Sequence, residues 1–244
     1  FKSFPIICCM KKLKSISAFF PMYNDEGSVE LMYKRLKKVL GKVASDYEII
    51  MVDDCSPDNS GEIADKIARK DKKVRVIHHE KNKGYGGALK SGFYNAKKEW
   101  VFYTDGDAQY DVAELEKLVP FANEYDVVTG YKINRADGWY RNFVSLAYNI
   151  FVRIFFNLKT KDVDCDFRLM KRKIFDRLNL VTDGSSFDLE MMKKIQDEKF
   201  TIKNIPVNHY DRIHGTSTAF KPARIIKTIK ELIVQWFELV LFKK

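Results

Sequence analysis

The stretch TDGDAQYD at residues 104–111 contains two carboxylates separated by one glycine, Asp105 and Asp107, directly after the apolar run EWVFY. Two carboxylates this close raise each other's pKa unless a cation lies between them. Mg²⁺ prefers oxygen ligands and is often shared with substrate phosphates, whose negative charge it helps to neutralise. The pair therefore predicts a site for Mg²⁺ or Mn²⁺, although a polar turn with solvated acids would have the same composition.

A second acidic pair, Asp53 and Asp54, directly follows the apolar run YEIIMV at residues 47–52. One of these carboxylates could accept hydrogen bonds from a nucleoside base. The alternative is that the pair caps the next helix, a role that Ser56, Asp58 and Ser60 could fill equally well. Whether the two acidic pairs belong to one site depends on the elements that precede them.

Apolar runs and helical spacings alternate along the first half of the chain. The predicted strands span 15–20, 47–52, 74–79, 99–105 and 125–130. The predicted helices span 28–43, 61–70, 111–124 and a segment that begins in the glycine-rich stretch NKGYGGALKSG. This order predicts an α/β fold with a mostly parallel sheet, in which ligands gather at the carboxyl ends of the strands. Five residues lie at such ends: Pro21, Asp53, Asp54, Asp105 and Asp107.

The glycine-rich stretch at residues 82–92 is not predicted to be a phosphate-binding loop. It lacks the pattern GxxxxGK[ST], and it fails GxGxxG because Leu89 occupies the position of the last glycine. We therefore interpret its glycines as a device that lets a helix begin close to the edge of the sheet.

Two apolar helices are predicted after residue 131. The segment 141–159 is mostly apolar with a narrow polar stripe, and either a core helix or an interfacial helix fits it. The segment 222–244 is amphipathic. Its predicted apolar face consists of Ile226, Ile229, Ile233, Trp236, Phe237 and Val240. Neither segment contains about 18 uncharged apolar residues in a row, so no transmembrane helix is predicted.

The composition excludes several classes of protein. The 244 residues are 45% hydrophobic, which argues against disorder, and the four cysteines lack the spacing of a zinc site. The net charge is +10, and residues 132–244 hold 22 basic against 13 acidic side chains. This excess indicates an anionic partner such as a phosphorylated substrate or a membrane surface. No RRM, zinc-finger or helix-turn-helix signature is present, so no nucleic acid is expected as a partner.

Seven motifs in a fixed order connect these observations to a known family. They are FFPMYNDEG, IIMVDDCSPDNS, NKGYGGALKSG, YTDGDAQYD, DVDCDFRLMKR, SSFDLEMM and VNHYDRIHGTS. Together they resemble family 2 glycosyltransferases of the GT-A fold, and among these the dolichol-phosphate mannose synthases and the bacterial polyprenyl-phosphate glycosyltransferases. The resemblance covers about residues 15–220. It implies an N-terminal extension at 1–14, a catalytic domain at 15–221 with a nucleotide-sugar half (15–131) and an acceptor half (132–221), and a C-terminal helix at 222–244.

The resemblance also implies roles for individual residues. Those that would bind the nucleotide-sugar donor are Pro21, Tyr23, Asp25, Val52, Asp54, Asp105, Gly106, Gln109 and Lys132. Asp105 and Asp107 would hold the metal. Arg141, Ser145 and Arg212 would bind the acceptor phosphate. The sequence departs from the usual pattern in three of these regions: Asp25 stands where Glu is usual, Lys132 stands where an Arg is common, and Thr218 stands where a Lys is expected.

The implied reaction is an inverting transfer of a hexose from a nucleotide-diphosphate sugar to a polyprenyl phosphate. An ionised phosphate acceptor needs no strong base, and Asp188 would then position the sugar or the acceptor beside Asp107 and Arg212. A hydroxyl of a glycan or glycolipid is the alternative acceptor, for which Asp188 would be the general base, with Asp164 and Asp166 as further candidates. Because a polyprenyl acceptor stays in the bilayer, the enzyme is expected to be cytoplasmic and peripheral at the inner face of a membrane.

Two other readings compete with this one. Phosphatases of the haloacid-dehalogenase type also use a DxD pair, but there it usually follows the first strand, whereas here it follows the fourth. An inactive sugar-binding or scaffold relative is the non-enzymatic alternative, and the intact Asp105–Asp107 pair argues against it.

Overall fold

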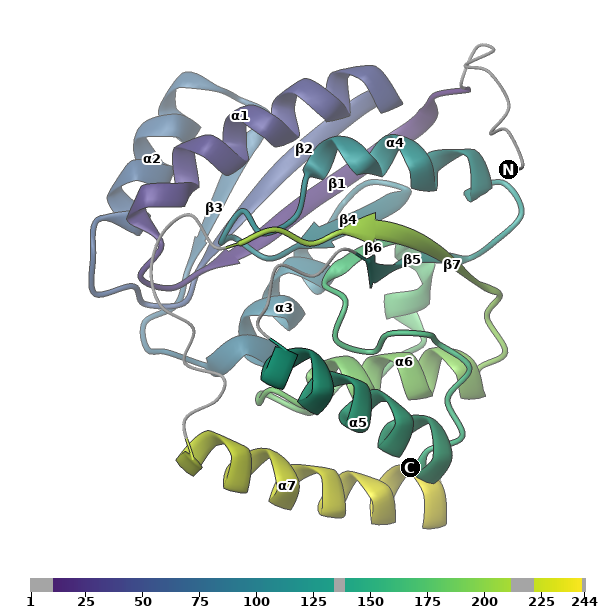
Figure 1. Ribbon diagram of the computed structural model, residues 1–244. Coiled ribbons are helices and arrows are strands. Elements are labelled where there is room, and N and C mark those ends of the chain that lie inside the picture. Colours follow the sequence, from purple (N-terminus) through teal and green to yellow (C-terminus); the bar gives the residue numbers. More distant parts are fainter. Residues whose placement is uncertain (1–10, 134–138, 212–221, 243–244) are drawn as a thin grey trace.

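The computed structural model describes residues 11–133, 139–211 and 222–242, and it describes 139–142 and 222–227 only as helical backbone. The described residues form a seven-stranded sheet in the order β3-β2-β1-β4-β6-β5-β7. The strands are β1 (Leu13–Met22), β2 (Ala44–Asp53), β3 (Val74–His78), β4 (Trp100–Thr104), β5 (Val127–Ile133), β6 (Phe167–Lys171) and β7 (Ile202–Asn208). Helices cover both faces of the sheet, so the predicted α/β architecture is confirmed (Figure 1).

The sheet is parallel in its first half and mixed in its second. β1 pairs in parallel with β2 and β4, and β2 pairs in parallel with β3. β6, which the sequence analysis did not predict, lies antiparallel between β4 and β5. β7, also not predicted, pairs in parallel with β5. The second half therefore departs from a simple strand–helix repeat.

One layer of helices contains α1 (Glu26–Val43), α2 (Ser60–Lys70) and the short α4 (Leu115–Leu118). The other layer contains α3 (Gly84–Asn95), α5 (Trp139–Phe155), α6 (Phe187–Asp197) and α7 (Pro222–Trp236), which continues as a π-helical turn at Phe237–Leu241. Figure 1 shows the two layers above and below the sheet. The predicted helix 111–124 is instead α4 between two 3₁₀ turns, and Pro120 contributes to this break because it has no amide hydrogen to donate.

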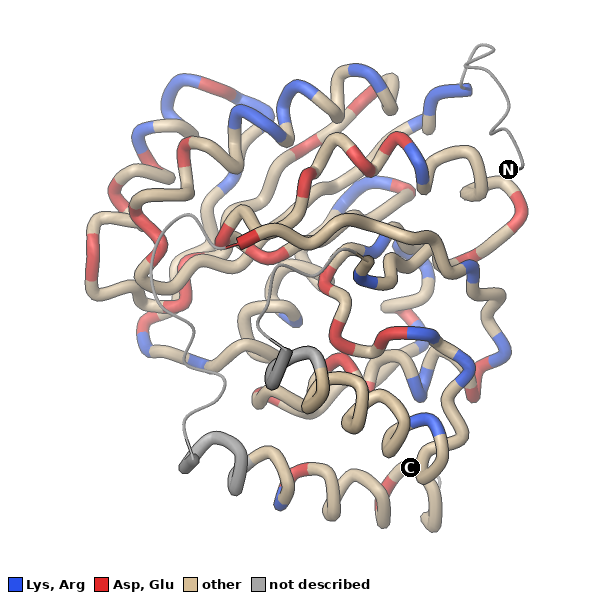
Figure 2. Tube along the Cα trace, viewed as in Figure 1, with Lys and Arg blue, Asp and Glu red and all other residues tan. Residues whose placement is uncertain are grey.

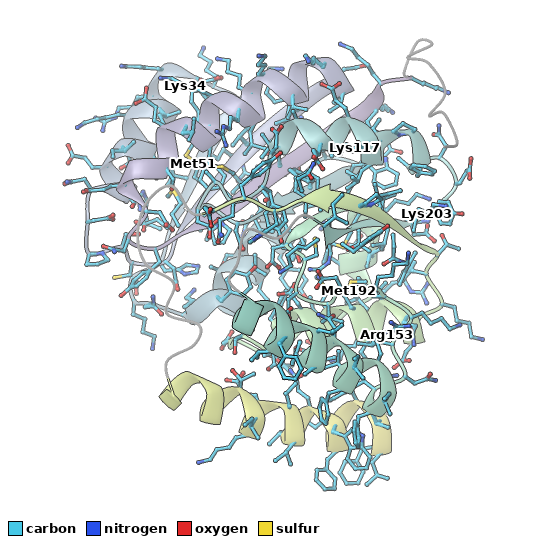
Figure 3. All side chains as sticks on the ribbon, in the orientation of Figure 1. Lys34, Met51, Lys117, Arg153, Met192 and Lys203 are labelled. Atoms are coloured by element: carbon cyan, nitrogen blue, oxygen red, sulfur yellow. The ribbon has the colours of Figure 1, made fainter. Side chains whose placement is uncertain are left out.

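Each face of the sheet has its own hydrophobic core, because alternate residues of a strand point to opposite faces. On β1, Phe20 packs toward α1 and α2, whereas its neighbour Phe19 packs toward α3 and α6. Met51 belongs to the first core and Met192 to the second, and Figure 3 shows their side chains on opposite sides of the sheet. The two cores hold the strand ends in fixed positions.

The glycines of α3 bring this helix close to the sheet, as the sequence predicts. A Cβ atom on Gly92 would lie 2.3 Å from the ring of Phe19 on β1, so any side chain there would push the helix away. Gly84 has a φ of +80°, which favours glycine, and its backbone approaches the carbonyl oxygen of Asp183. The start of α3 therefore lies against the loop at residues 182–186, and its later turns pack against β1.

The apolar face predicted for the C-terminal helix is divided between two surfaces. Trp236 and Val240 pack against the domain, and the indole Nε1 of Trp236 donates to the carbonyl oxygen of Phe155 at 3.0 Å. Ile229 and Ile233 are instead half exposed. Trp236 and Val240 thus lie on the side of the helix that packs on the domain, together with Leu232, Gln235 and Leu239, which also turn inward. No helix within the described residues has the length and apolarity needed to cross a bilayer.

Candidate functional site

A cleft of about 380 Å³ opens at the carboxyl ends of β1, β2 and β4. Seven of the predicted residues line it: Pro21, Tyr23, Asp25, Asp54, Asp105, Gly106 and Asp107. The other lining residues are Met22, Asn82, Gly84, Tyr85 and Ala88. The fold thus brings the two acidic pairs to one edge of the sheet, although Asp53 itself does not line the cleft.

The turns that follow these strands hold their backbone in an unusual conformation. Asn24, Cys55 and Ala108 follow β1, β2 and β4 and have φ values of 60°, 60° and 62°. A left-handed conformation costs about 1–2 kcal/mol for a residue with a side chain. Surrounding contacts must offset this cost, and such strain concentrates at functional sites. The three turns therefore mark the same edge that the acidic residues mark.

Asp54 anchors the glycine-rich loop at the start of α3. Its carboxylate accepts hydrogen bonds from the amides of Lys83 and Gly84 at 2.7 and 3.0 Å. Its Oδ1 also lies 2.6 Å from Nδ1 of His79, whose Nε2 contacts the hydroxyl of Ser91. Three protein groups thus already bind this carboxylate, which positions the loop in addition to lining the cleft.

Asp53 serves the turn and the neighbouring strand. Its Oδ1 accepts from the amide of Ser56 at 2.9 Å, and its Oδ2 lies 2.9 Å from Nδ1 of His78. His78 in turn contacts Asp65 on α2 at 3.0 Å. Asp53 therefore stabilises the turn before α2, whereas Asp54 lines the cleft.

Asp105 and Asp107 flank Gly106 at the end of β4. The hydroxyl of Tyr85 donates to Oδ1 of Asp105 at 2.9 Å, and Asp107 accepts from the amide of Gln109 at 3.1 Å. Burial, followed by the nearby Asp107 carboxylate, raises the pKa of Asp105 to about 7. A Cβ atom on Gly106 would lie 2.4 Å from the carbonyl oxygen of Pro21, so this position has no room for a side chain.

This loop fits a divalent cation bound partly by the protein and partly by a substrate. Among the described residues no group of three or more Asp, Glu, His or Cys side chains forms a complete metal cage. Mg²⁺ is usually held by one or two carboxylates together with phosphates and water, and Asp105 and Asp107 supply such a pair. Burial and, after it, the charge of Asp107 raise the pKa of Asp105, and a cation bound at this loop would offset both effects.

A buried ionic cluster lies beneath the cleft. The side chain of Arg168 on β6 is fully buried, and its Nη1 donates to Oδ1 of Asp188 at 2.5 Å. The hydroxyl of Tyr103 donates to the same Asp188 oxygen at 2.7 Å. Asp166 lies 3.8 Å from Arg168, and its buried Oδ1 makes no hydrogen bond with the described residues. Burial, together with the charge of Asp188, raises the pKa of Asp166 well above its ordinary value.

The cluster changes the ranking of the candidate bases. Asp188 is buried and one of its oxygens is occupied by two donors, so its ability to accept a proton from an acceptor is reduced. Asp166 keeps an oxygen without a donor. Asp166 therefore has an oxygen that could accept a proton, whereas Asp188 is paired with Arg168 through one of its oxygens.

Ser145 and Lys132 line a separate cavity of about 240 Å³ beside the second half of the sheet. Nζ of Lys132 donates to the carbonyl oxygen of Asp164 at 2.6 Å. Burial lowers the pKa of Lys132, but the carboxylates of Asp162 and Asp164 outweigh burial, and the net pKa is raised. Lys161 lines the same cavity. A serine and two lysines thus lie around one small cavity.

Other predicted residues are placed differently or lie outside the description. The side chain of Val52 is fully buried in the core and does not line the cleft. Gln109 donates through Nε2 to the carbonyl oxygen of Tyr210 and so ties the DxD loop to the end of β7. Arg141 lies on α5, but its side chain is outside the described residues, as is the whole of Arg212.

The structure adds residues that the sequence analysis did not select. Tyr85, Asn82 and His79 build or support the cleft, and Arg168 neutralises the buried acids. Asn82, Tyr85 and Arg168 lie in the motifs NKGYGG and CDFRL, but contacts with residues about 20 to 40 positions away determine the roles of all four. Glu26, which follows Asp25, contacts Asn59 and does not line the cleft.

The sequence of this chain was compared with family models and with known proteins. The model of glycosyl transferase family 2 matches residues 17–178. An undecaprenyl-phosphate 4-deoxy-4-formamido-L-arabinose transferase of Aeromonas hydrophila is 30% identical over 84% of this chain and 63% of its own length. The glycosyltransferase AglD of Haloferax volcanii is 31% identical over 79% of this chain and 32% of its own length. The chain thus spans less than two thirds of either relative.

Two solved structures share the fold at low sequence identity. Glucosyl-3-phosphoglycerate synthase from Mycobacterium tuberculosis, in complex with Mn²⁺, UDP and phosphoglyceric acid, superimposes with a TM-score of 0.72 at 15% identity. That match covers 91% of this chain and 78% of the synthase. The mannosyltransferase PcManGT from Pyrobaculum calidifontis, in complex with GDP-Man and Mn²⁺, gives a TM-score of 0.64 at 18% identity. It covers 93% of this chain and 68% of PcManGT.

Proposed function

The chain belongs to glycosyl transferase family 2, and we propose that it transfers a hexose from a nucleotide-diphosphate sugar to a polyprenyl phosphate at a membrane surface. The observation that carries this proposal is the cleft in which Asp54, Asp105 and Asp107 meet at the carboxyl ends of three parallel strands. The similarity to undecaprenyl-phosphate and AglD glycosyltransferases supports the choice of acceptor.

In this proposal the donor diphosphate binds at the loop of Asp105 and Asp107. A divalent cation held there supplies positive charge that stabilises the leaving diphosphate. Tyr85 holds the Asp105 carboxylate in place through its hydroxyl. Tyr23 is half exposed at the mouth of the cleft, where its ring can stack on a nucleoside base. The nucleotide thus lies over the ends of β1 and β2, and the reacting sugar lies near the end of β4.

The acceptor phosphate attacks the anomeric carbon from the face opposite the diphosphate. A carbon–oxygen bond to the acceptor phosphate forms while the bond to the diphosphate breaks, which inverts the configuration at that carbon. An ionised phosphate has no proton to lose. The reaction therefore does not require Asp188 to accept a proton, although Tyr103 and Arg168 already donate to its Oδ1. Ser145, together with Arg141 one helical turn earlier, would hold this phosphate.

A hydroxyl acceptor is the second candidate, and one observation favours it. Oδ1 of Asp166 is buried and makes no hydrogen bond with the described residues, and the pKa of this carboxyl is raised. Both properties suit a general base that removes a proton from a sugar hydroxyl. An assay with an alcohol or a glycan as acceptor tests this candidate. Transfer by the wild type that is lost in the variant Asp166→Asn would support it over the first.

The membrane part of the proposal rests on α5, α7 and the turn that follows α7. Their outward surface, here called the apolar platform, consists of Phe143, Leu146, Ile150, Ile154, Ile229, Ile233, Phe237 and Leu241, each between 45% and 70% exposed. In Figure 2 the coloured parts of these helices contain fewer charged positions than α1 and α2 in the opposite layer. Large exposed apolar surfaces mark interaction sites, and a lipid-borne acceptor requires the enzyme to meet a bilayer.

A thermal-shift panel tests the donor half of the proposal. UDP-, GDP- and dTDP-sugars are compared with and without Mn²⁺ or Mg²⁺. A donor that binds the native state raises the melting temperature by linkage. We expect one nucleotide class to raise the melting temperature only when the metal is present. A protein that responds to none of these donors would contradict the proposed function.

A further inference from the structure

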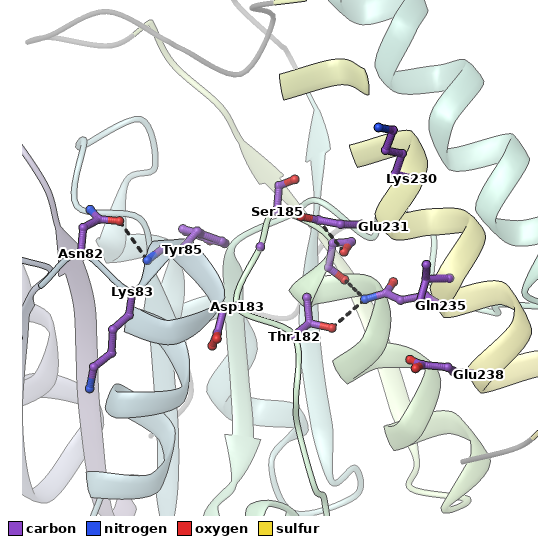
Figure 4. A pocket seen from close by; sticks show the side chains of 14 residues that line it. Asn82, Lys83, Tyr85, Thr182, Asp183, Ser185, Lys230, Glu231, Gln235 and Glu238 are labelled. Carbon is purple, nitrogen blue, oxygen red and sulfur yellow. Dashed lines mark hydrogen bonds between the residues drawn. The ribbon is translucent and has the colours of Figure 1, made fainter. Parts of the chain in front are cut away.

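A second cavity of about 760 Å³ adjoins the donor cleft (Figure 4). The two cavities share three lining residues, Asn82, Gly84 and Tyr85, from the glycine-rich start of α3. The opposite walls come from the loop at residues 182–186 and from α7. Both of these walls lie beyond residues 17–178, which match the family model, whereas the start of α3 lies within them.

Gln235 on α7 provides the strongest sign of a ligand. Its side chain is 4% exposed, and its Nε2 donates to the hydroxyl of Thr182 at 2.8 Å and to the carbonyl oxygen of Ser186 at 3.2 Å. Because a carbonyl oxygen can only accept, these contacts fix which end of the amide is nitrogen. The other end, Oε1, has no hydrogen-bond partner in the described part of the chain. A buried acceptor of this kind destabilises the fold unless a hydrogen-bond donor reaches it.

The neighbouring groups of the cavity also accept hydrogen bonds. Glu231 accepts from the hydroxyl of Ser186 at 2.9 Å, and Glu238 contributes a second carboxylate to the lining of the cavity. In Figure 4, Lys83 and Lys230 extend away from the polar side chains at the centre of the cavity. Carboxylates and an amide oxygen repel a phosphate, whereas they suit the hydroxyl donors of a sugar ring.

Tyr85 connects this cavity to the proposed reaction. It lines both cavities, and its hydroxyl donates to Asp105 at 2.9 Å. A group attached to a diphosphate at Asp105 and Asp107 therefore lies next to the entrance of the second cavity. We propose that this cavity is a glycosyl subsite that receives the sugar ring of the donor, with Glu231 and Gln235 selecting the sugar by its hydroxyl pattern. This inference rests on the proposed function.

The test compares the binding of nucleotides with that of nucleotide sugars by isothermal titration calorimetry in Mn²⁺. UDP, GDP, UDP-glucose and GDP-mannose are titrated into the wild type, Glu231→Gln and Ser185→Trp. Glu231→Gln keeps an oxygen for the Ser186 hydroxyl, and Ser185→Trp fills the cavity from an exposed position. Glu62→Gln and Ser45→Trp make the same chemical changes at exposed positions far from the cavity in sequence and serve as matched controls.

We expect the wild type to bind the correct nucleotide sugar about tenfold more tightly than the nucleotide alone, since two ligand hydrogen bonds supply this difference. Both cavity variants lose that ratio and keep nucleotide affinity, while the controls keep both. Unchanged ratios in both cavity variants would overturn the subsite while leaving the proposed function intact. A ratio that depends instead on added polyprenyl phosphate would assign the cavity to the acceptor and overturn the donor assignment. Absence of nucleotide binding in the wild type would overturn both proposals.

Discussion

The acids at the end of β2 and the acids of the buried cluster are stabilised in different ways. Asp54 is held by two backbone amides and a histidine at the edge of an open cleft. Asp188 is held by the side chains of Arg168 and Tyr103 inside the fold. Backbone amides stay in place when one side chain changes, whereas a buried ion pair fails when either partner is lost. The comparison therefore predicts that substitutions at the cleft affect function and that substitutions in the cluster affect stability.

The largest effect is expected from Arg168→Met. This change leaves the buried Asp188 carboxylate without its cation, and breaking a buried pair in this way costs about 3–5 kcal/mol of unfolding free energy. Urea denaturation measures the loss. The double variant Arg168→Met/Asp188→Asn removes both charges and should recover a large part of it. Equal instability of the single and double variants would show that packing of the arginine, and not its charge, supports the cluster.

In contrast to Arg168→Met, Asp107→Asn should lower activity and leave stability nearly unchanged. The substitution removes one carboxylate from the proposed cation site, which we expect to lower turnover at least about 100-fold, or about 3 kcal/mol of transition-state stabilisation. The unfolding free energy should stay close to that of the wild type, because Asp107 contributes little to either core. Asp111→Asn, at a carboxylate that caps the turn just beyond the DxD loop, is a control for charge. Near-normal turnover of Asp107→Asn, or of wild type in excess EDTA, would contradict the metal hypothesis.

The stability of the metal-free protein should depend on pH because the pKa of Asp105 differs between the folded and the unfolded chain. The pKa of Asp105 is about 7 in the folded protein and 3.8 ordinarily, so between pH 4 and 7 the unfolded chain loses this proton first. Metal-free protein should therefore become less stable as the pH rises through this window. The pKa difference limits the effect to about 4 kcal/mol, and for a partly exposed carboxyl we expect about half of that.

The variant Asp105→Asn isolates this contribution. Without metal, it should melt at a higher temperature than the wild type at pH 8 and at the same temperature at pH 4. Mg²⁺ should stabilise the wild type at pH 8 and leave the variant unchanged. A wild type whose metal-free stability does not fall between pH 4 and 7 would show that Asp105 is ionised throughout.

The smallest effect is expected at the apolar platform. Removing residues 222–244 would also remove the buried Leu232 and Leu239, so point substitutions are the cleaner test. Ile233→Glu and Ile154→Glu each place a charge on the exposed surface and should weaken binding to anionic vesicles about tenfold. Co-sedimentation measures the binding. If the wild-type protein does not bind these vesicles at low salt, the membrane proposal is wrong and a soluble acceptor is indicated.

The first half of the fold could be predicted because it repeats simple units. The runs that precede Asp53 and Asp105 are continuous apolar segments, and such runs indicate strands buried on both faces. The positions of Pro21, Asp54 and Asp107 at one edge followed from the parallel order of these strands. Sequence pattern and structure agree there because every strand and its following helix are neighbours in the chain.

The second half could not be predicted in the same way. β6 and β7 are short strands of mixed direction, and their pairing depends on residues more than 30 positions away. The pairing of Arg168 with Asp188 joins β6 to α6, and the rotation of α7 depends on Leu232 and Gln235 meeting the domain. Such contacts depend on packing between distant segments, which periodicity within one segment does not encode.

The most direct test of the central claim is a transfer assay with defined acceptors. Purified protein is incubated with the donor chosen by the thermal-shift panel, Mn²⁺, and either undecaprenyl phosphate or undecaprenol in mixed micelles, with wild type beside Asp107→Asn. We expect glycosylated undecaprenyl phosphate to form with the phosphate acceptor and no product to form with undecaprenol, and we expect the rate to fall with EDTA and in the variant. Transfer to undecaprenol, or an equal rate for Asp107→Asn, would contradict the central claim.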